Sequence, residues 1–269
     1  MSVLPNSKMK RLTSIFLALF FSLALVIQGW AALSFTLTDS AADNVDRNAY
    51  TVPVSGSFTP VSGALYYLFL HNTKGAASVD TPTVTGTNGW SVTWTQEATS
   101  PYDLVSGTNR KRVTLFSAVA SSAIAGVLTV DFAGATQNSI GWSLIKVSGN
   151  AASGYTVQVK IGEITSVGTA LTITLDNAFS NSGNENLSGI GKTDDTATNP
   201  GTGFAEISDL TWINPSAALE TNNLANDTSC DWTWTGNAKA GGISVEVAIA
   251  VVGGCAGSRL ALTGVGAGC

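Results

Sequence analysis

Residues 243–251, Ile-Ser-Val-Glu-Val-Ala-Ile-Ala-Val, are the longest stretch of this chain in which aliphatic residues alternate with small or polar ones. A period of two places the aliphatic side chains on one face of a β-strand and the remaining side chains on the other. Shorter runs with the same period lie at 50–54, 128–132, 155–161 and 171–175. The chain is therefore expected to form strands that each bury one face.

Further strands are expected where β-branched and aromatic residues lie between turn residues, at 34–38, 64–71, 90–96, 111–118 and 140–147. Their spacing of about 8–12 residues is typical of all-β domains with antiparallel sheets. We expect one β-sandwich domain at 32–252, with a jelly-roll-like arrangement. Residues 180–203 look loop-rich and allow a short strand near 187–191. Residues 215–221 allow one helical turn at most, and a Gly-rich tail follows at 253–269.

The first 31 residues have the layout of a secretory signal peptide. Three basic residues at positions 8–11 precede an apolar run at 12–27, and small residues follow before a cleavage point at Ala31 or Ala32. The alternative is a membrane helix, but the run is short for a span of about 20 residues. We therefore expect a secreted protein, extracellular or at the cell surface, that leaves the membrane after cleavage.

The chain carries 13 Lys and Arg residues and 18 Asp and Glu residues. Without the three basic residues of the signal, 10 remain against 18, and the exported chain has a net charge of −8. An acidic chain of this kind, in which we expect no basic cluster, repels phosphate groups. Nucleic acid and anionic membranes are therefore not expected partners.

The three cysteines, Cys230, Cys255 and Cys269, are too few for a disulfide framework. Cys230 and Cys255 could form a bridge in an oxidising compartment, and the sequence leaves the pairing open. No spacing of Cys and His residues indicates zinc. The core is therefore expected to depend on packing and not on cross-links.

Residues with catalytic chemistry are scarce. The single histidine, His71, ends an expected strand, and no Gly-x-Ser-x-Gly motif places a nucleophile for it. A pair of carboxylates could still hydrolyse a glycosidic bond, and the acids on strand-like segments are Glu97, Glu163, Glu206 and Glu246. Lone acidic residues on strands are usually solvated, so we expect a noncatalytic protein that needs no cofactor.

Calcium is the one metal that the sequence favours. Asp39, Asp43 and Asp46 lie in one short segment with Asn44 and Asn48. Calcium prefers several oxygen ligands from a flexible loop, and these side chains could supply them. The segment lacks the ordered spacing of an EF-hand loop. Asp and Asn also favour turns for backbone reasons, and a solvated turn is the interpretation we prefer.

The tryptophans indicate a ligand site. Trp232 and Trp234 share one face of an expected strand, Asp231 lies on its other face, and Trp212 lies in a separate segment. Coplanar tryptophans on a strand can form a flat platform for sugar rings, so these four residues are the candidate ligand-binding residues. The alternative is that the tryptophans belong to the core, where large aromatic side chains dominate.

Several segments follow one another in a familiar order. They are residues 65–71, Thr83-Val84-Thr85-Gly86, residues 112–116 (Arg-Val-Thr-Leu-Phe), residues 126–132 and 140–149, and residues 231–234 (Asp-Trp-Thr-Trp) ahead of Gly241-Gly242. This order resembles a loosely defined group of β-sandwich modules found in phage structural proteins and bacterial surface proteins. The resemblance implies a noncatalytic display or adhesion module, and it transfers no functional residue.

Three functions remain open. The first is a secreted noncatalytic module that binds a cell-surface glycan or a protein partner. The second is a structural subunit that assembles, as a homo-oligomer or with other chains, by donating residues 34–38 or the tail to a strand edge. The third is a glycoside hydrolase with a dispersed pair of carboxylates.

Overall fold

The computed structural model describes residues 32–75, 81–103, 110–213, 216–225 and 227–250. Within them, Ala32–Ala250 form one compact unit of β-strands and a single 3-10 turn, η1 (Asn88–Trp90). No helix in this described part has the length and apolarity needed to cross a membrane. The expected signal at 1–31 and the tail at 253–269 lie outside the described residues. The expectation of an all-β chain is confirmed.

The strands form three antiparallel sheets. The first has five strands in the order β1 (Ser34–Asp43), β8 (Ser139–Ser148), β3 (Leu65–Lys74), β6 (Arg110–Val119) and β5 (Thr95–Asp103). The second has three short strands in the order β2 (Ala49–Val52), β7 (Leu128–Asp131) and β4 (Thr83–Gly86). The third has the order β11 (Thr198–Pro200), β14 (Ser229–Val247), β10 (Glu185–Lys192), β13 (Ser216–Ala225) and β12 (Ala205–Ile213), with β9 (Thr156–Thr174) paired to β14.

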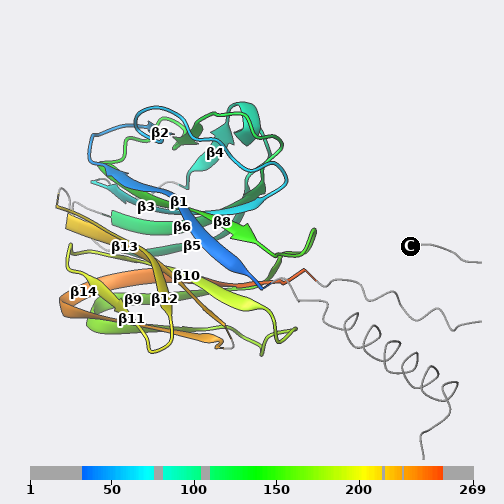
Figure 1. Ribbon diagram of the computed structural model, residues 1–269. Helices are drawn as coiled ribbons and strands as arrows, with labels where there is room; N and C mark the ends of the chain where they lie inside the picture. Colours follow the sequence, from blue (N-terminus) through cyan, green and yellow to red (C-terminus); the bar gives the residue numbers. More distant parts are fainter. Residues whose placement is uncertain (1–31, 76–80, 104–109, 214–215, 226, 251–269) are drawn as a thin grey trace, which may run out of the picture. The chain divides into compact units, whose positions relative to one another are not determined.

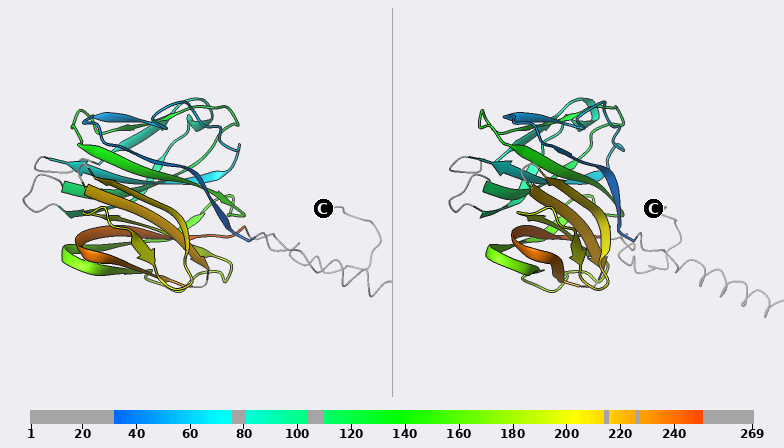
Figure 2. Two further views of the ribbon diagram at one scale, coloured as in Figure 1. Left: turned by 60° about the vertical axis from the view of Figure 1, so that its left-hand side comes forward. Right: turned by 90° about the vertical axis from the view of Figure 1, so that its left-hand side faces the viewer.

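The sheets are stacked in three layers, and the five-stranded sheet lies in the middle (Figures 1 and 2). Alternate residues of β3 belong to opposite cores: Leu65, Tyr67 and Phe69 face the six-stranded sheet, and Tyr66, Leu68 and Leu70 face the three-stranded sheet. The middle strands are apolar on both faces because both faces are buried, as is usual for a sheet covered on two sides. Each buried side chain of this size stabilises the fold by about 1.5–3 kcal/mol.

Two glycines allow the middle sheet and the six-stranded sheet to approach closely. A Cβ atom on Gly189 of β10 would lie 2.4 Å from the ring of Phe69, and a Cβ atom on Gly241 of β14 would lie 2.3 Å from the ring of Tyr102. Both distances are far shorter than van der Waals contact, and close-packed interiors do not tolerate such overlap. These positions therefore require glycine, and the aromatic rings fill the space that a side chain would take.

A third apolar cluster covers the outer face of the six-stranded sheet. The C-terminal half of β14 pairs with β10, and its N-terminal half pairs with β11, while β9 runs beside both halves. The register between β9 and β14 shifts between Thr233 and Ala238. The cluster includes Trp232, Trp234 and Ile190. The six-stranded sheet is thus buried on both faces around β10.

Several strand boundaries differ from the expectation. The strand expected at 90–96 begins only at Thr95, because Trp90 ends η1 and donates its indole N–H to the Phe58 carbonyl (3.0 Å). The short strand expected near 187–191 is present as the interior strand β10, and residues 180–203 also contain the short strand β11. Most of 215–221 belongs to the interior strand β13. Their Gly, Ser and Asn residues reflect close sheet packing and buried polar contacts instead of a loop.

Candidate functional site

The tryptophans expected to form a sugar platform are buried. Trp232 is 0% exposed, and Trp212 and Trp234 are each 5% exposed. The indole N–H groups of Trp234 and Trp212 donate hydrogen bonds within the fold, at 2.9 and 3.0 Å. Asp231 is exposed on the other face of β14 and accepts a hydrogen bond from Thr172 (2.6 Å). A ring must expose its face to stack on a sugar, so the three tryptophans are core residues and form no platform.

Asp39, Asp43 and Asp46 bind different neighbours and do not converge. Asp39 accepts the indole N–H of Trp142 (2.6 Å), Asp43 pairs with Arg47 (3.2 Å), and Asp46 lies 3.5 Å from a side-chain amide of another loop. Among the residues that the structure describes, no three acidic, His or Cys side chains form a group able to hold a metal. The calcium site expected at these three residues is therefore not formed.

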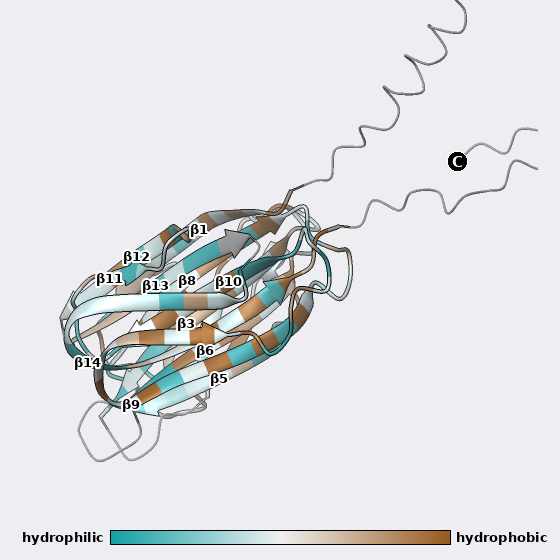
Figure 3. Ribbon diagram, turned by 90° about the horizontal axis from the view of Figure 1, so that it is seen from below, coloured by the Kyte–Doolittle hydropathy of each residue, from teal (hydrophilic) through white to brown (hydrophobic). Residues whose placement is uncertain are grey.

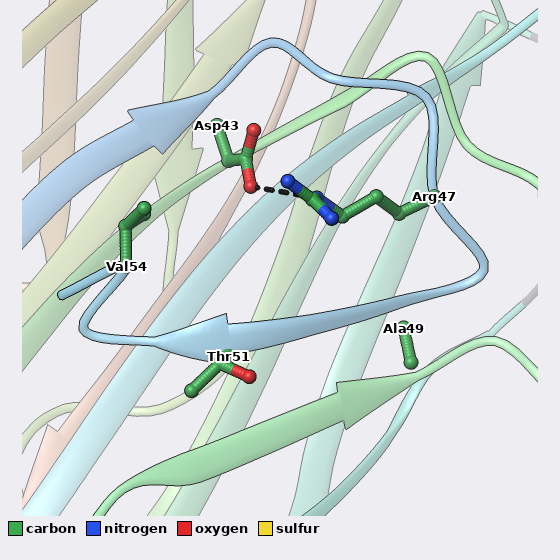
Figure 4. A pocket seen from close by; sticks show the side chains of 5 residues that line it. All are labelled: Asp43, Arg47, Ala49, Thr51 and Val54. Atoms are coloured by element: carbon green, nitrogen blue, oxygen red, sulfur yellow. Dashed lines mark hydrogen bonds and ion pairs between the residues drawn. The ribbon is translucent and has the colours of Figure 1, made fainter.

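A shallow surface pocket lies beside the same segment (Figure 4). Asp43, Arg47, Ala49, Thr51 and Val54 line it, and its volume is about 160 Å³. Its two charged side chains pair with each other at 3.2 Å. Small-molecule sites usually have volumes of about 300–1,000 Å³, so we assign no ligand to this pocket.

The single histidine is an internal residue. His71 and Tyr102 are buried between the middle and the six-stranded sheets, and His71 Nε2 lies 2.7 Å from the Tyr102 hydroxyl. Burial, and then the nearby Lys111 ammonium, hold the pKa of His71 well below its usual value. The ring is therefore neutral and positions Tyr102, and it is not exposed to a substrate.

The carboxylates considered for glycoside hydrolysis make separate contacts. Glu246 accepts hydrogen bonds from side chains of the 158–184 region at 2.6–2.9 Å. Glu163 on β9 accepts the Ser100 hydroxyl (2.9 Å), and Glu97 on β5 accepts a serine hydroxyl of β6. Glu206 is exposed on β12. The fold thus uses three of these four carboxylates as hydrogen-bond acceptors on three different strands.

Cys230 is fully buried in the outer cluster and forms no disulfide with another described residue. Its Sγ lies 3.4 Å from Asn222 Oδ1. Burial raises the pKa of the thiol to about 12, which leaves it unreactive at neutral pH. Cys255 and Cys269 lie outside the described residues, so the bridge considered between Cys230 and Cys255 stays a prediction.

The end of β3 and the beginning of β6 bring positive charges together. Lys74 lies directly opposite Arg110, and Asn72 lies directly opposite Arg112. Opposite residues of paired strands share a face, and alternation places Arg110 and Arg112 on the same face. Lys111 points to the other face. We call Lys74, Arg110 and Arg112 the basic row.

The basic row is unusual in this domain. Between residues 32 and 250 the chain has nine Lys and Arg residues against eighteen Asp and Glu residues, and four of the nine lie at this one end of two paired strands. The side chains of the row are half-buried, and Arg112 donates a hydrogen bond to Thr81. Like charges placed directly opposite on a sheet destabilise it. The register of β3 against β6 thus gathers positive charge at this end of the sheet.

The other face of the same strand end carries charges that are paired within the fold. Lys111 is 2% exposed, and its Nζ lies 3.4 Å from a backbone carbonyl after β10. Burial lowers the pKa of Lys111 to about 8, against the opposing effect of nearby aspartates. Lys239 of β14 pairs with Asp103 of β5 (2.6 Å), so this ion pair connects the two strands. On the outer face of the six-stranded sheet, Lys192 of β10 pairs with Asp194 (3.0 Å).

Comparisons of this chain with protein-family models, curated proteins and solved structures found no match.

The expectation that the chain has no basic cluster is wrong, because the basic row is such a cluster. Its signal was present in the sequence as the consecutive residues Arg110-Lys111-Arg112. The contribution of Lys74 had no such signal, because only the register of β3 against β6 brings it opposite Arg110.

Proposed function

We propose that this protein is an exported, noncatalytic β-sandwich module that binds an acidic cell-surface glycan through the basic row. The observation that carries the proposal is the placement of Lys74 opposite Arg110, beside Arg112, in an otherwise acidic domain. Guanidinium groups bind carboxylates and sulfates through two parallel hydrogen bonds, which are stronger than bonds between neutral groups. Uronic acid or sulfated sugars present such groups.

The strand order supports the sandwich and its jelly-roll-like arrangement. In the first half of the domain, β1, β8, β3, β6 and β5 are neighbours in one sheet, and β2, β7 and β4 are neighbours in the sheet that covers it. An eight-stranded jelly roll consists of two such sheets. Sandwich domains commonly bind ligands at the ends of their strands, and the basic row lies at one such end.

The charge of the whole domain restricts the ligand. With nine basic against eighteen acidic residues in 32–250, the domain repels extended polyanions. The repulsion is screened beyond about 8–10 Å at physiological salt, so a short acidic segment that contacts only the row is still attracted. An acidic oligosaccharide fits this condition better than a long phosphate polymer does.

Glycan-array binding of residues 32–269 tests the proposal. We expect carboxylated and sulfated glycans to bind and neutral glycans not to bind, with affinity falling as salt is raised. The double variant R110Q/R112Q should weaken binding by at least about tenfold, the equivalent of one charge-assisted hydrogen bond. The double variant K146Q/K160Q removes the same charge from β8 and β9 and should bind like the wild type. Equal binding of neutral and acidic glycans would contradict the proposal.

A second function, assembly through a strand edge, is favoured by β9. This strand pairs only with β14 in the described structure, and Val157, Ile161 and Val167 on it are 42%, 41% and 63% exposed. Figure 3 shows β9 and β5 along one side of the domain. A long edge strand with exposed aliphatic residues can pair with another chain. The strand at 34–38, considered as a donated strand, instead pairs with β8 of its own chain.

Light scattering after size-exclusion chromatography tests this second function. If β9 is the contact, the mass should rise with protein concentration, and the variant I161K should stay monomeric. The variant I124K, which changes a more exposed isoleucine outside β9, should assemble like the wild type. A monomer at all concentrations would exclude self-assembly through β9.

A further inference from the structure

The side chain of Glu220 is a buried carboxyl group without a hydrogen-bond partner. Glu220 lies on β13, between Ile190 of β10 and Asp209 of β12, and it is 0% exposed. Ile190 belongs to the outer cluster, so the carboxyl lies on the outer face of the six-stranded sheet. Neither of its oxygens has a hydrogen-bond partner. Buried polar groups are nearly always satisfied, and this one requires an explanation.

The groups around Glu220 are predominantly acidic. From β12, Asp209 lies directly opposite it, and Glu206 lies on the same strand. From β10, Lys192 is the nearby cation, but its Nζ already binds Thr196 and Asp194. From β14 comes the neutral thiol of Cys230, and from β11 the hydroxyl of Thr198. An ionised Glu220 would therefore be a buried negative charge beside other negative charges.

We propose that Glu220 and Asp209 bind a divalent cation of the calcium type, with Thr198 Oγ1 as a neutral ligand. Opposite residues of paired strands have Cβ atoms about 4.5–5.5 Å apart, close enough for two carboxylates to share one ion. Thr198 Oγ1 is likewise buried without a hydrogen-bond partner. Two carboxylates are sufficient, because calcium completes its six to eight oxygen ligands with neutral groups and water.

The exposure of the two acids gives the ion a way in. Asp209 is exposed on β12, at the edge of the sheet, whereas Glu220 is enclosed one strand further in. An ion that first meets Asp209 reaches Glu220 without crossing the apolar cores. Extracellular calcium sites with few carboxylates have Kd values of about 10⁻⁴–10⁻³ M, which is the range expected here. This site lies apart from the basic row, and the inference does not depend on the proposed function.

Thermal unfolding and terbium luminescence of residues 32–269, after removal of metals with a chelator, test the inference. Calcium at about ten times its Kd should raise the Tm of the wild type by about 3–6 °C. Tb³⁺ should show luminescence sensitised by Trp232 and Trp234, which lie in the same layer. Calcium should displace the Tb³⁺.

Variants separate a specific site from general effects of charge. E220Q keeps the shape of the protonated side chain and should fold, yet it should lose both the Tm rise and the terbium signal. D209N should weaken both at least about tenfold. D176N removes an exposed carboxylate of the ion pair with Lys160 and should respond like the wild type. A wild type without a Tm rise or terbium signal at pH 8.5, or an E220Q variant that retains them, would overturn the inference.

Discussion

Lys74 on β3 and Arg110 on β6 lie directly opposite each other where the two strands end. Two positive side chains in this relationship destabilise a sheet by about 0.2–1 kcal/mol relative to neutral residues. A neutral polar residue at either position would avoid this cost, because both side chains are half-buried at the end of the sheet. The pair concentrates positive charge at the end of the sheet, and this concentration is the basis of the proposed acidic-glycan site.

Replacing Arg110 by Gln should separate stability from binding. Removing one of two opposed charges should leave the free energy of unfolding unchanged or raise it by about 0.2–1 kcal/mol. The same change should reduce binding of an acidic glycan, because one guanidinium contact is lost. Urea unfolding and glycan binding of R110Q, with K160Q as the control, measure both. A variant that loses stability and keeps its binding would show that Arg110 is structural.

Glu220 should make the stability of the metal-free protein depend on pH. Its folded pKa of about 9 lies above the unfolded value of 4.5, so the folded state holds the proton more tightly. This contribution is fully present below pH 4.5 and is lost as pH rises toward 9, with a slope of at most about 1.4 kcal/mol per pH unit. E220Q should remove the slope in urea unfolding with chelator present. An equal slope in both proteins would assign the pH dependence elsewhere.

His71 should have the opposite pH dependence on the acid side. Its folded pKa is lowered by burial, so the unfolded chain binds the proton more tightly. Stability is present above the unfolded value of 6.5 and is lost as pH falls below it. The variant Y102F removes the hydroxyl beside His71 Nε2 and should cost about 1–3 kcal/mol at pH 7.5, because the buried nitrogen loses its partner. Y155F, which changes a half-buried tyrosine, is the control.

Gly189 should not tolerate a methyl group. The Cβ of an alanine there would lie 2.4 Å from the Phe69 ring, and inserting a group into a packed core typically costs about 1–3 kcal/mol. Urea unfolding should show this loss for G189A. The second variant F69L frees space at the same contact, so G189A/F69L should lose less stability than the sum of the two single variants. Additive losses would show that the two residues do not contact each other.

Trp232 should contribute to stability and not to sugar binding. Its side chain is 0% exposed in the outer cluster, and truncating a buried Trp to Ala costs about 3–5 kcal/mol. W232A should therefore lower the free energy of unfolding strongly. W232F retains an aromatic ring and should keep most of the stability. Any loss of glycan binding by W232A should accompany loss of folded protein, which circular dichroism on the same sample detects.

The candidate site was only partly visible in the sequence. The residues Arg110-Lys111-Arg112 are adjacent in the chain. Their alternation on a strand decides that Lys111 is buried on one face and that the two arginines share the opposite face. Glu220 had no local signal, because residues 215–221 lack the alternation typical of a half-exposed strand. It became a candidate only when β12 placed Asp209 opposite it.

The sequence by itself determined that the chain is all-β, because period-two alternation is a local property of each strand. It also determined which aromatic residues are large enough to fill the cores. Only the tertiary structure decided that the tryptophans are buried, since a strand shows which residues share a face but not what covers that face. Burial of Trp232 and the pairing of Lys74 with Arg110 both arise from contacts between segments distant in the chain, and no local pattern encodes such contacts.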